Sequence, residues 1–261
     1  MAATVEERGI VQANKRLTDR LWLLDVEAPE TCARLLPGQF VHLQVPGMEG
    51  HILRRPFSVY YRDADARVMT ILYQVVGFGS RQLTTIRPGA VVSLMGPIGT
   101  GWTVPAGAHR ALLVAGGVGA APLFMHAEEL VAAGIAVDVV LGAQTADALV
   151  CEPRYTALLA HEPYLATDDG SRGHAGFVTD VVSDLIAQNA YDYAACCGPE
   201  PMMRIVSAMT VAAGIPSYVS LEKRMACGIG ACLGCIVETT DGLRRSCVDG
   251  PIFDAGKVVW A

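Results

Sequence analysis

Four of the eight cysteines in this 261-residue chain lie close together near its end. Cys227, Cys232, Cys235 and Cys247 follow the pattern C-x4-C-x2-C-x11-C. Eight cysteines are too few for a disulfide-built scaffold of this length, and clustered thiols in a reducing compartment typically bind metal. The spacing therefore predicts a metal centre formed by these four side chains.

The first three of these cysteines have the spacing of plant-type [2Fe–2S] sites, in which a tight loop surrounds the cluster and a distant fourth thiolate completes it. Gly228, Gly230 and Gly234 lie between the ligands. Without side chains they would let backbone N–H groups approach inorganic sulfide. Structural zinc is the alternative, but zinc sites usually combine two C-x2-C pairs and this chain has one. The pattern favours a [2Fe–2S] cluster.

Two glycine-rich turns predict a dinucleotide site. A strand at 111–115 leads into Gly116-Gly117-Val118-Gly119 and a helix, and a later strand leads into Cys197-Gly198-Pro199-Glu200 and another helix. Each turn would present backbone N–H groups to a pyrophosphate at a helix N-terminus. The match to G-x-G-x-x-G is partial, so a tight turn without a ligand remains the alternative.

The choice between NAD and NADP rests on the residues that would meet a 2′-phosphate. The loop at 143–147 has no Arg or Lys, which favours NAD. The loop around Asp168, Ser171 and Arg172 could also approach the cofactor.

A third candidate site is Arg54-Arg55-Pro56-Phe57-Ser58. An Arg fork can bind a diphosphate while the following strand presents aromatic and hydroxyl groups to a flat ring. The alternative is a pair of surface arginines that face water.

Three segments must position these groups. Short apolar runs separated by Pro-Gly turns predict a β-barrel over 1–104, interrupted by one short helix near Gly79 and Ser80. Residues 105–217 alternate between strands (111–115, 137–142, 164–167, 193–197) and helices (120–133, 176–189, 200–213), which is typical of a parallel sheet. The tail, 218–261, is too short to bury a core and would depend on its metal. We expect a β-barrel domain, an α/β parallel-sheet domain and a small C-terminal [2Fe–2S] domain.

Charge and hydropathy exclude several classes of protein. The formal net charge of −6 gives no reason to bind nucleic acid or an anionic membrane. The acidic N-terminus does not resemble a signal peptide, and no uncharged stretch reaches the length of a membrane span. We expect a cytoplasmic protein.

The motifs occur in the order seen in the ferredoxin-reductase family: Arg55-Pro-Phe-Ser, Gly77-Phe-Gly79-Ser80, Gly96-Pro-Ile-Gly-Thr-Gly101, Gly116-Gly-Val-Gly and Cys197-Gly-Pro-Glu. The tail from Leu221 to Cys235 more specifically resembles the electron-transfer subunits of type B dihydroorotate dehydrogenases, and the resemblance covers nearly the whole chain.

This resemblance implies roles for individual residues. FAD would contact Arg55, Pro56, Phe57 and Ser58, with Arg55 on the diphosphate; Leu72, Tyr73 and Gln74 would line the flavin, and Gly79 and Ser80 would meet the phosphates. NAD would lie against Gly116, Gly117 and Gly119, and the nicotinamide against Cys197, Gly198, Pro199 and Glu200. The cluster ligands would be Cys227, Cys232, Cys235 and Cys247. Phe57 departs from the smaller aliphatic residue that relatives often carry.

The resemblance also implies a function in pyrimidine (UMP) biosynthesis. A separate FMN-containing subunit would oxidise dihydroorotate, and this chain would pass the electrons through [2Fe–2S] and FAD to NAD⁺. We expect a heterotetramer of two plus two subunits, and no residue here that binds dihydroorotate or acts on it as acid or base. Met225, Ile229 and Leu233 could contact the partner or pack on the barrel.

Three other functions fit the sequence. The chain could be a reductase subunit linked to NAD(P)H and ferredoxin or to a hydrogenase, a binding protein with a structural zinc, or a redox sensor.

Overall fold

The computed structural model of the chain describes residues 4–48 and 50–260. The chain folds into two compact units. The first contains Met1–Gly101, Glu222–Val237 and Arg244–Pro251, and the second contains Trp102–Leu221, Glu238–Leu243 and Ile252–Ala261. The tail is thus shared between the units, while the predicted boundaries at 104 and 217 stay predictions.

The first unit is built on an antiparallel sheet whose strands follow the order β4-β3-β7-β1-β2-β6-β5. β4 also contacts β6, so the sheet curls. Alternate side chains such as Val41, Leu43 and Leu94 are fully buried. The strands are β1 (Val5–Arg16), β2 (Leu21–Glu27), β3 (Phe40–Gln44), β4 (Arg55–Ser58), β5 (Tyr61–Asp63), β6 (Val68–Gln74) and β7 (Val91–Ile98), with the short helices α1 (Pro29–Arg34) and α2 (Phe78–Leu83).

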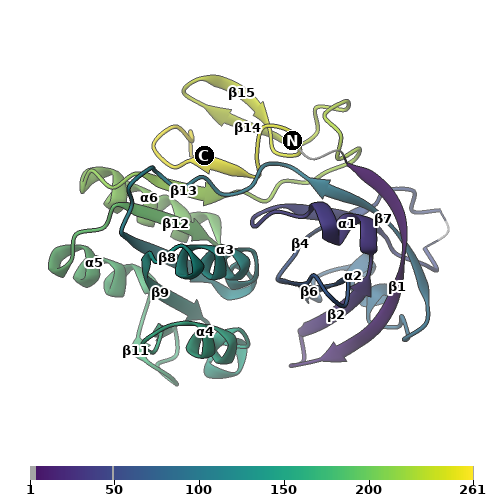
Figure 1. Cartoon of the computed structure of the whole chain (residues 1–261), viewed down its shortest axis with the longest axis horizontal. Coiled ribbons are helices and arrows are strands. Elements are labelled where there is room, and N and C mark those ends of the chain that lie inside the picture. The colour runs from purple at the N-terminus through teal and green to yellow at the C-terminus, as the bar shows by residue number, and fades with distance from the viewer. Residues whose placement is uncertain (1–3, 49, 261) are drawn as a thin grey trace. The chain divides into compact units, whose positions relative to one another are not determined.

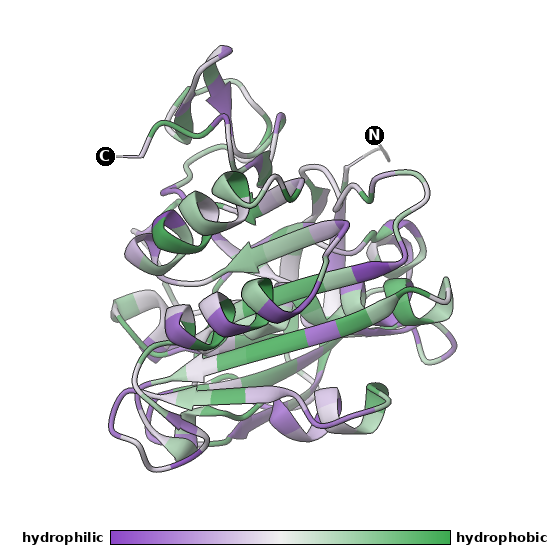
Figure 2. Cartoon of the chain, turned by 90° about the vertical axis from the view of Figure 1, so that its left-hand side faces the viewer, coloured by the Kyte–Doolittle hydropathy of each residue, from purple (hydrophilic) through white to green (hydrophobic). Residues whose placement is uncertain are grey.

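The second unit is a mostly parallel sheet in the order β11-β10-β9-β8-β12-β13-β16 (Figure 1). Its central strands are strongly apolar (Figure 2), as expected for a sheet covered on both faces. Its strands are β8 (Arg110–Gly116), β9 (Ala136–Ala143), β10 (Tyr164–Thr167), β11 (His174–Ala175), β12 (Tyr193–Cys197), β13 (Ser217–Ser220) and the antiparallel β16 (Ile252–Asp254).

Helices α3 (Ala120–Ala132) and α4 (Glu152–Leu158) contact each other, as do α5 (Val178–Gln188) and α6 (Glu200–Ala212). The chain moves outward from β8 through β9 to β10 and later returns to β12 on the other side of β8. The strand order therefore reverses between β8 and β12, which is where doubly wound sheets bind ligands. The predicted strands and the three longer helices are confirmed. The sequence analysis missed α4, which is short and has Pro153 in its first turn.

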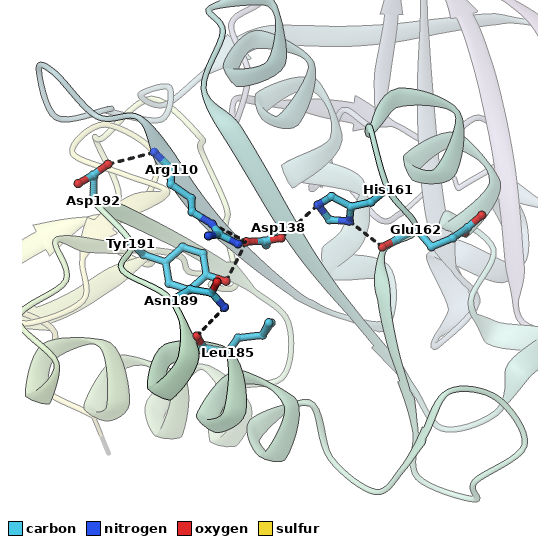
Figure 3. A network of polar contacts seen from close by, with 8 residues as sticks. All are labelled: Arg110, Asp138, His161, Glu162, Leu185, Asn189, Tyr191 and Asp192. Carbon is cyan, nitrogen blue, oxygen red and sulfur yellow. Dashed lines mark hydrogen bonds and ion pairs between the residues drawn. The ribbon is translucent and has the colours of Figure 1, made fainter.

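A polar network anchors the amino ends of β8 and β9 (Figure 3). Asp138 is 3% exposed, and its carboxylate accepts hydrogen bonds from Arg110 Nε (2.9 Å) and Nη2 (2.7 Å) and from Tyr191 Oη (2.9 Å). His161 Nε2 lies 3.1 Å from the same carboxylate. A buried carboxylate needs such partners. Because Arg110 begins β8, the network lies at the end of the sheet opposite the two glycine-rich turns.

The tail packs on the first unit through its cysteine-rich segment. Cys235 and Cys247 form a buried cluster with Phe40 of β3 and Ile98 of β7, flanked by Met95, Met225 and Val248. The backbone N–H of Thr100 donates to the carbonyl of Gly250 (2.6 Å). This segment therefore shares a core with the barrel strands. The rest of the tail contributes β16 and a two-stranded sheet of β14 (Ile236–Thr239) and β15 (Gly242–Arg245).

Among the described residues, no helix has both the length and the apolar character that crossing a membrane requires.

Candidate functional site

The four predicted ligand cysteines lie in two pairs. Cys235 and Cys247 are buried, with their Sγ atoms 3.4 Å apart. Cys227 is partly exposed and Cys232 exposed, and their side chains are hydrogen-bonded to each other. In the part of the chain that the structure describes, no three His, Cys, Asp or Glu side chains gather around one point that could hold a metal ion.

The ligand loop, residues 227–235, directs backbone N–H groups at sulfur. Cys227 Sγ accepts from the N–H groups of Ile229 (3.5 Å) and Cys232 (3.4 Å), and Cys232 Sγ accepts from that of Gly234 (3.5 Å). Gly228 has a φ of +69°, a conformation that glycine adopts without strain. The loop thus has the backbone geometry expected of one that wraps a sulfur-rich cluster.

The electrostatics of the two cysteine pairs differ. Burial raises the pKa of Cys227, but the N–H groups of Ile229 and Cys232 outweigh that effect and lower it to about 6. Burial, followed by the hydrogen bond with Cys235, raises the pKa of Cys247 to about 12. Cys227 therefore forms a thiolate readily, whereas Cys247 does so only with a bound cation.

The two arginines at the start of β4, Arg54 just before it and Arg55 its first residue, have different contacts. Arg54 donates to Ser93 O (3.0 Å) and Oγ (2.9 Å) and pairs with Glu6 (2.5 Å). Within the described residues, Arg55 donates only to the carbonyls of Leu53 (2.5 Å) and Arg54 (3.4 Å), and it has no carboxylate partner there. Its guanidinium is therefore available for an anion.

Arg55 lies over the start of α2. A Cβ on Gly79 would be 3.0 Å from Arg55 Nε, so only glycine allows this approach without displacing the arginine. The hydroxyl of Ser80 accepts from the N–H groups of Val76 (2.9 Å) and Gly77 (3.0 Å), and thereby closes the turn before the helix. The predicted contacts of Gly79 and Ser80 with phosphate stay predictions.

The predicted flavin-lining residues of β6 divide between its two faces. Tyr73 faces Phe57 of β4, with ring centroids 6.1 Å apart, and its hydroxyl donates to Asn14 Oδ1 (3.0 Å). Leu72 and Gln74 lie on the opposite face because side chains alternate along a strand. A flat ring on one face would therefore meet the side chains of Phe57 and Tyr73, or those of Leu72 and Gln74.

The two glycine-rich turns of the second unit interlock. β8 and β12 are parallel neighbours, with Ala115 opposite Cys197. A Cβ on Gly119 would overlap the carbonyl oxygen of Cys197, and one on Gly198 would lie 2.9 Å from Cα of Gly116. Glycine at these positions lets the two backbones touch. The structure therefore brings the predicted residues of both turns together at the switch point.

Gly117 provides an open surface at this junction. Its φ is +56°, and an added Cβ would meet nothing within 4 Å. A pocket beside it is lined by Gly117, Ala120, Leu141, Gly142, Ala148, Leu149, Cys151 and Glu152. The sequence analysis missed Glu152, because only the fold brings it beside Gly117. Arg172, the one basic residue considered for this region, is paired with Glu152 (2.5 Å).

His42 of β3 was not among the residues predicted from the sequence. Its side chain is fully buried, and neither ring nitrogen has a hydrogen-bond partner among the described residues. The only signal in the sequence is a polar residue within the apolar run Phe40-Val-His-Leu.

Family models match most of the chain. Residues 4–102 match an oxidoreductase FAD-binding domain, residues 113–208 an oxidoreductase NAD-binding domain, and residues 222–259 the iron-sulfur cluster binding domain of dihydroorotate dehydrogenase B.

Curated relatives agree with these matches. The chain is 40% identical over 228 residues to the dihydroorotate dehydrogenase B (NAD(+)) electron transfer subunit of Geobacillus sp. (strain WCH70), covering 85% of this chain and 86% of the relative. It is 38% identical over 259 residues to the subunit of the same name from Bacillus caldolyticus, covering 97% and 98%.

Solved structures show the same architecture. The NADH-dependent reduced ferredoxin-NADP oxidoreductase matches with a TM-score of 0.88 and 28% identity, over 97% of this chain and 90% of that one. The ferredoxin reductase of carbazole 1,9a-dioxygenase matches with a TM-score of 0.68 and 22% identity, over 82% and 67%, and this likeness concerns the fold alone.

The ferredoxin-reductase-like fold and the FAD, NAD and iron–sulfur domains expected from the sequence are thereby confirmed. The chain belongs to the family of electron transfer subunits of the oxidoreductase dihydroorotate dehydrogenase B (NAD(+)).

Proposed function

We propose that this chain carries electrons from the FMN of a dihydroorotate-oxidising subunit, through a [2Fe–2S] cluster and FAD, to NAD⁺ in pyrimidine biosynthesis. One observation supports this order above the others. The buried cysteines pack on β3 and β7, and β3 is hydrogen-bonded to β4, the strand that carries Arg55–Ser58. Neighbouring strands lie about 4.8 Å apart. The cluster ligands and the proposed flavin strand are therefore separated by a single strand of one unit.

The two cysteine pairs support a two-iron cluster. A [2Fe–2S] centre has four thiolate ligands, two for each iron, whereas a structural zinc gathers all four around one ion. The arrangement with two thiolates for each iron is matched by the two pairs, Cys227 with Cys232 and Cys235 with Cys247.

The chain's own residues hold the cofactors in this proposal. FAD supplies the exchange between one-electron and two-electron transfer. Arg55 would bind its diphosphate, because this guanidinium has no carboxylate partner in the described chain. Phe57 or Ser58, whose side chains lie on opposite faces of β4, would face the flavin, and Gly79 would leave room for the diphosphate beside Arg55.

The interlocked turns would bind NAD. Gly116, Gly117 and Gly119 would present backbone N–H groups to the pyrophosphate at the start of α3, and the turn from Cys197 to Glu200 would border the nicotinamide. The pocket beside Gly117 offers a carboxylate, Glu152, to the ribose, and a carboxylate disfavours a 2′-phosphate. NAD is therefore favoured over NADP.

The partner surface would include the tip of the ligand loop. Met225 packs on the barrel, whereas Ile229 and Leu233 are 60% and 61% exposed. We assign these two side chains to the contact with the catalytic subunit, in a heterotetramer of two plus two. A cytoplasmic location is in keeping with eight cysteines that are all free thiols.

Anaerobic reconstitution with the FMN-containing subunit tests the function. We expect dihydroorotate to reduce NAD⁺ only when both subunits are present, and this chain alone to contain FAD and two irons. A colourless zinc protein without flavin would contradict the proposal.

The same preparation also tests the second candidate, a ferredoxin-linked reductase subunit. That candidate is favoured by the structural match to the NADH-dependent reduced ferredoxin-NADP oxidoreductase. Electron transfer to ferredoxin, together with no response to dihydroorotate, would support it.

A further inference from the structure

His42 is a buried polar side chain without a protein partner. It lies in the middle of β3 at 0% exposure, among the buried apolar residues Phe40, Val41 and Leu43. Neither Nδ1 nor Nε2 forms a hydrogen bond within the described residues. Leaving a buried polar group unsatisfied is costly, and such groups nearly always have a hydrogen-bond partner.

The ring points toward the ligand loop. Because side chains alternate along a strand, His42 shares a face of β3 with Phe40, which packs against Cys235 and Cys247. A Cβ on Gly228 would lie 2.7 Å from His42 Nδ1 and 3.1 Å from Met95 Cε. The loop backbone next to Cys227 therefore rests on the imidazole, and glycine is required there.

His42 also borders the proposed flavin strand. It is paired with Pro56 of β4 on one side and with Met95 of β7 on the other. Burial, and then the charges of Arg54 and Arg55, lower its pKa to about 4. The ring is therefore neutral at physiological pH and has one N–H donor.

We propose that His42 is a positioning residue that donates its ring N–H to a sulfur atom of the iron–sulfur cluster. The inference rests on the proposed assignment of the four cysteines as cluster ligands. Hydrogen bonds to cluster sulfurs tune the reduction potential. Such a donor stabilises the reduced cluster, which carries the additional negative charge, and so raises its potential. The same contact would fix the ligand loop on β3, one strand away from β4.

The first test detects the contact directly. The full-length holoprotein is labelled with ¹⁵N-histidine, its cluster is reduced, and hyperfine couplings are measured by pulsed electron paramagnetic resonance. His42 contacts the ligand loop at Gly228, and the His42→Phe variant identifies its signal among those of the six histidines. We expect one ¹⁵N coupling in the unsubstituted protein and none in His42→Phe.

The second test measures the potential in a redox titration of the holoprotein. His42→Phe should lower the equilibrium constant for reduction about tenfold, which is about 59 mV for a one-electron couple. His42→Gln keeps an N–H donor and should restore part of the shift. Met95→Leu alters the packing against Gly228 without removing a donor, so its potential should equal that of the unsubstituted protein.

Each outcome is decisive. If the labelled protein shows no ¹⁵N coupling, or if His42→Phe keeps both its iron and its potential, the inference is wrong and the ring has only a packing role. If His42→Phe does not fold, the labelled unsubstituted protein still shows whether the ¹⁵N coupling exists. An iron-free unsubstituted protein would instead refute the proposed function.

Discussion

At the residue scale, two adjacent arginines are distinguished by their contacts alone. Arg54 is bound to Glu6 and Ser93 and so joins β4 to β1 and β7. In the part of the chain that the structure describes, Arg55 makes hydrogen bonds only within its own segment. The first arginine therefore stabilises the barrel, and the second remains for a ligand.

Substitution of Arg55 should weaken FAD binding. Removing a hydrogen-bonding group from a charged partner costs about 2 kcal/mol, so Arg55→Ala should raise the FAD dissociation constant roughly 30-fold. Arg54→Ala is the matched control and should lower thermal stability while retaining FAD. Flavin fluorescence on titration of the apoprotein measures the FAD dissociation constant of both variants. Equal losses of FAD in the two variants would contradict the assignment of Arg55.

The cysteines give the second prediction at this scale. Cys232 is exposed and has no role in the core, so Cys232→Ser should remove a cluster ligand without unfolding the barrel. Iron analysis and the visible spectrum should show loss of most of the cluster, with FAD retained. Cys32→Ala is the control, because Cys32 is a buried residue of α1 and not part of the ligand loop. A Cys232→Ser protein with its full iron content would show that Cys232 is not a ligand.

At the element scale, the proposed NAD site depends on two strand-to-helix turns that touch. Parallel pairing of β8 with β12 brings the turns to the same end of the sheet, and glycines remove the side chains that would separate them. The helices α3 and α6 begin directly after these turns. The positions of both helix N-termini are thus set by backbone contact.

Gly119→Ala should disturb this junction. The new methyl would overlap the carbonyl of Cys197, and overpacking of this kind costs about 1–3 kcal/mol. We expect a lower melting temperature and weaker NADH binding by calorimetry. Gly134→Ala is the control, since its methyl meets nothing within 4 Å and its φ of +77° costs only about 1 kcal/mol. Gly134→Ala should lose some stability and keep its NADH affinity. Unchanged NADH binding in Gly119→Ala would argue against the proposed NAD site.

At the scale of the whole molecule, the pH dependence of stability should involve one buried histidine of the second unit. His126 of α3 is fully buried, with Nε2 2.9 Å from Tyr193 Oη and its ring stacked on Trp102. Burial lowers its pKa, although Glu129 partly opposes that effect. The folded protein therefore disfavours a charge that the unfolded chain accepts.

This difference predicts loss of stability in mild acid. Because the folded-state pKa is below the unfolded value of about 6.5, the contribution is complete above that pH and is lost as pH falls below it, by at most about 1.4 kcal/mol per pH unit. Denaturant unfolding between pH 8 and 5 measures the slope. His126→Phe should reduce this slope, while the share of the buried His42, whose pKa is also lowered, should remain. An equal slope in the two proteins would refute the role of His126.

The sequence by itself determined the features that are local along the chain. The cysteine spacing, the glycines of both turns and the alternation of strands with helices are set within a few residues, so they predicted the fold class and the candidate residues. The short helix α4 escaped prediction because seven residues give too weak a periodic signal. So did β16, whose three residues form a strand only through pairing with β13.

The tertiary structure alone decided which of these residues meet. Contacts between distant segments decide how the cysteines pair on β3 and β7 and how the two turns interlock. They also decide that, among the described residues, Arg55 has no carboxylate partner and His42 no hydrogen-bond partner. Gly228 and His42, for example, touch only because the chain folds its tail onto the third strand. No spacing along the chain encodes such contacts, since they arise from the packing of whole elements.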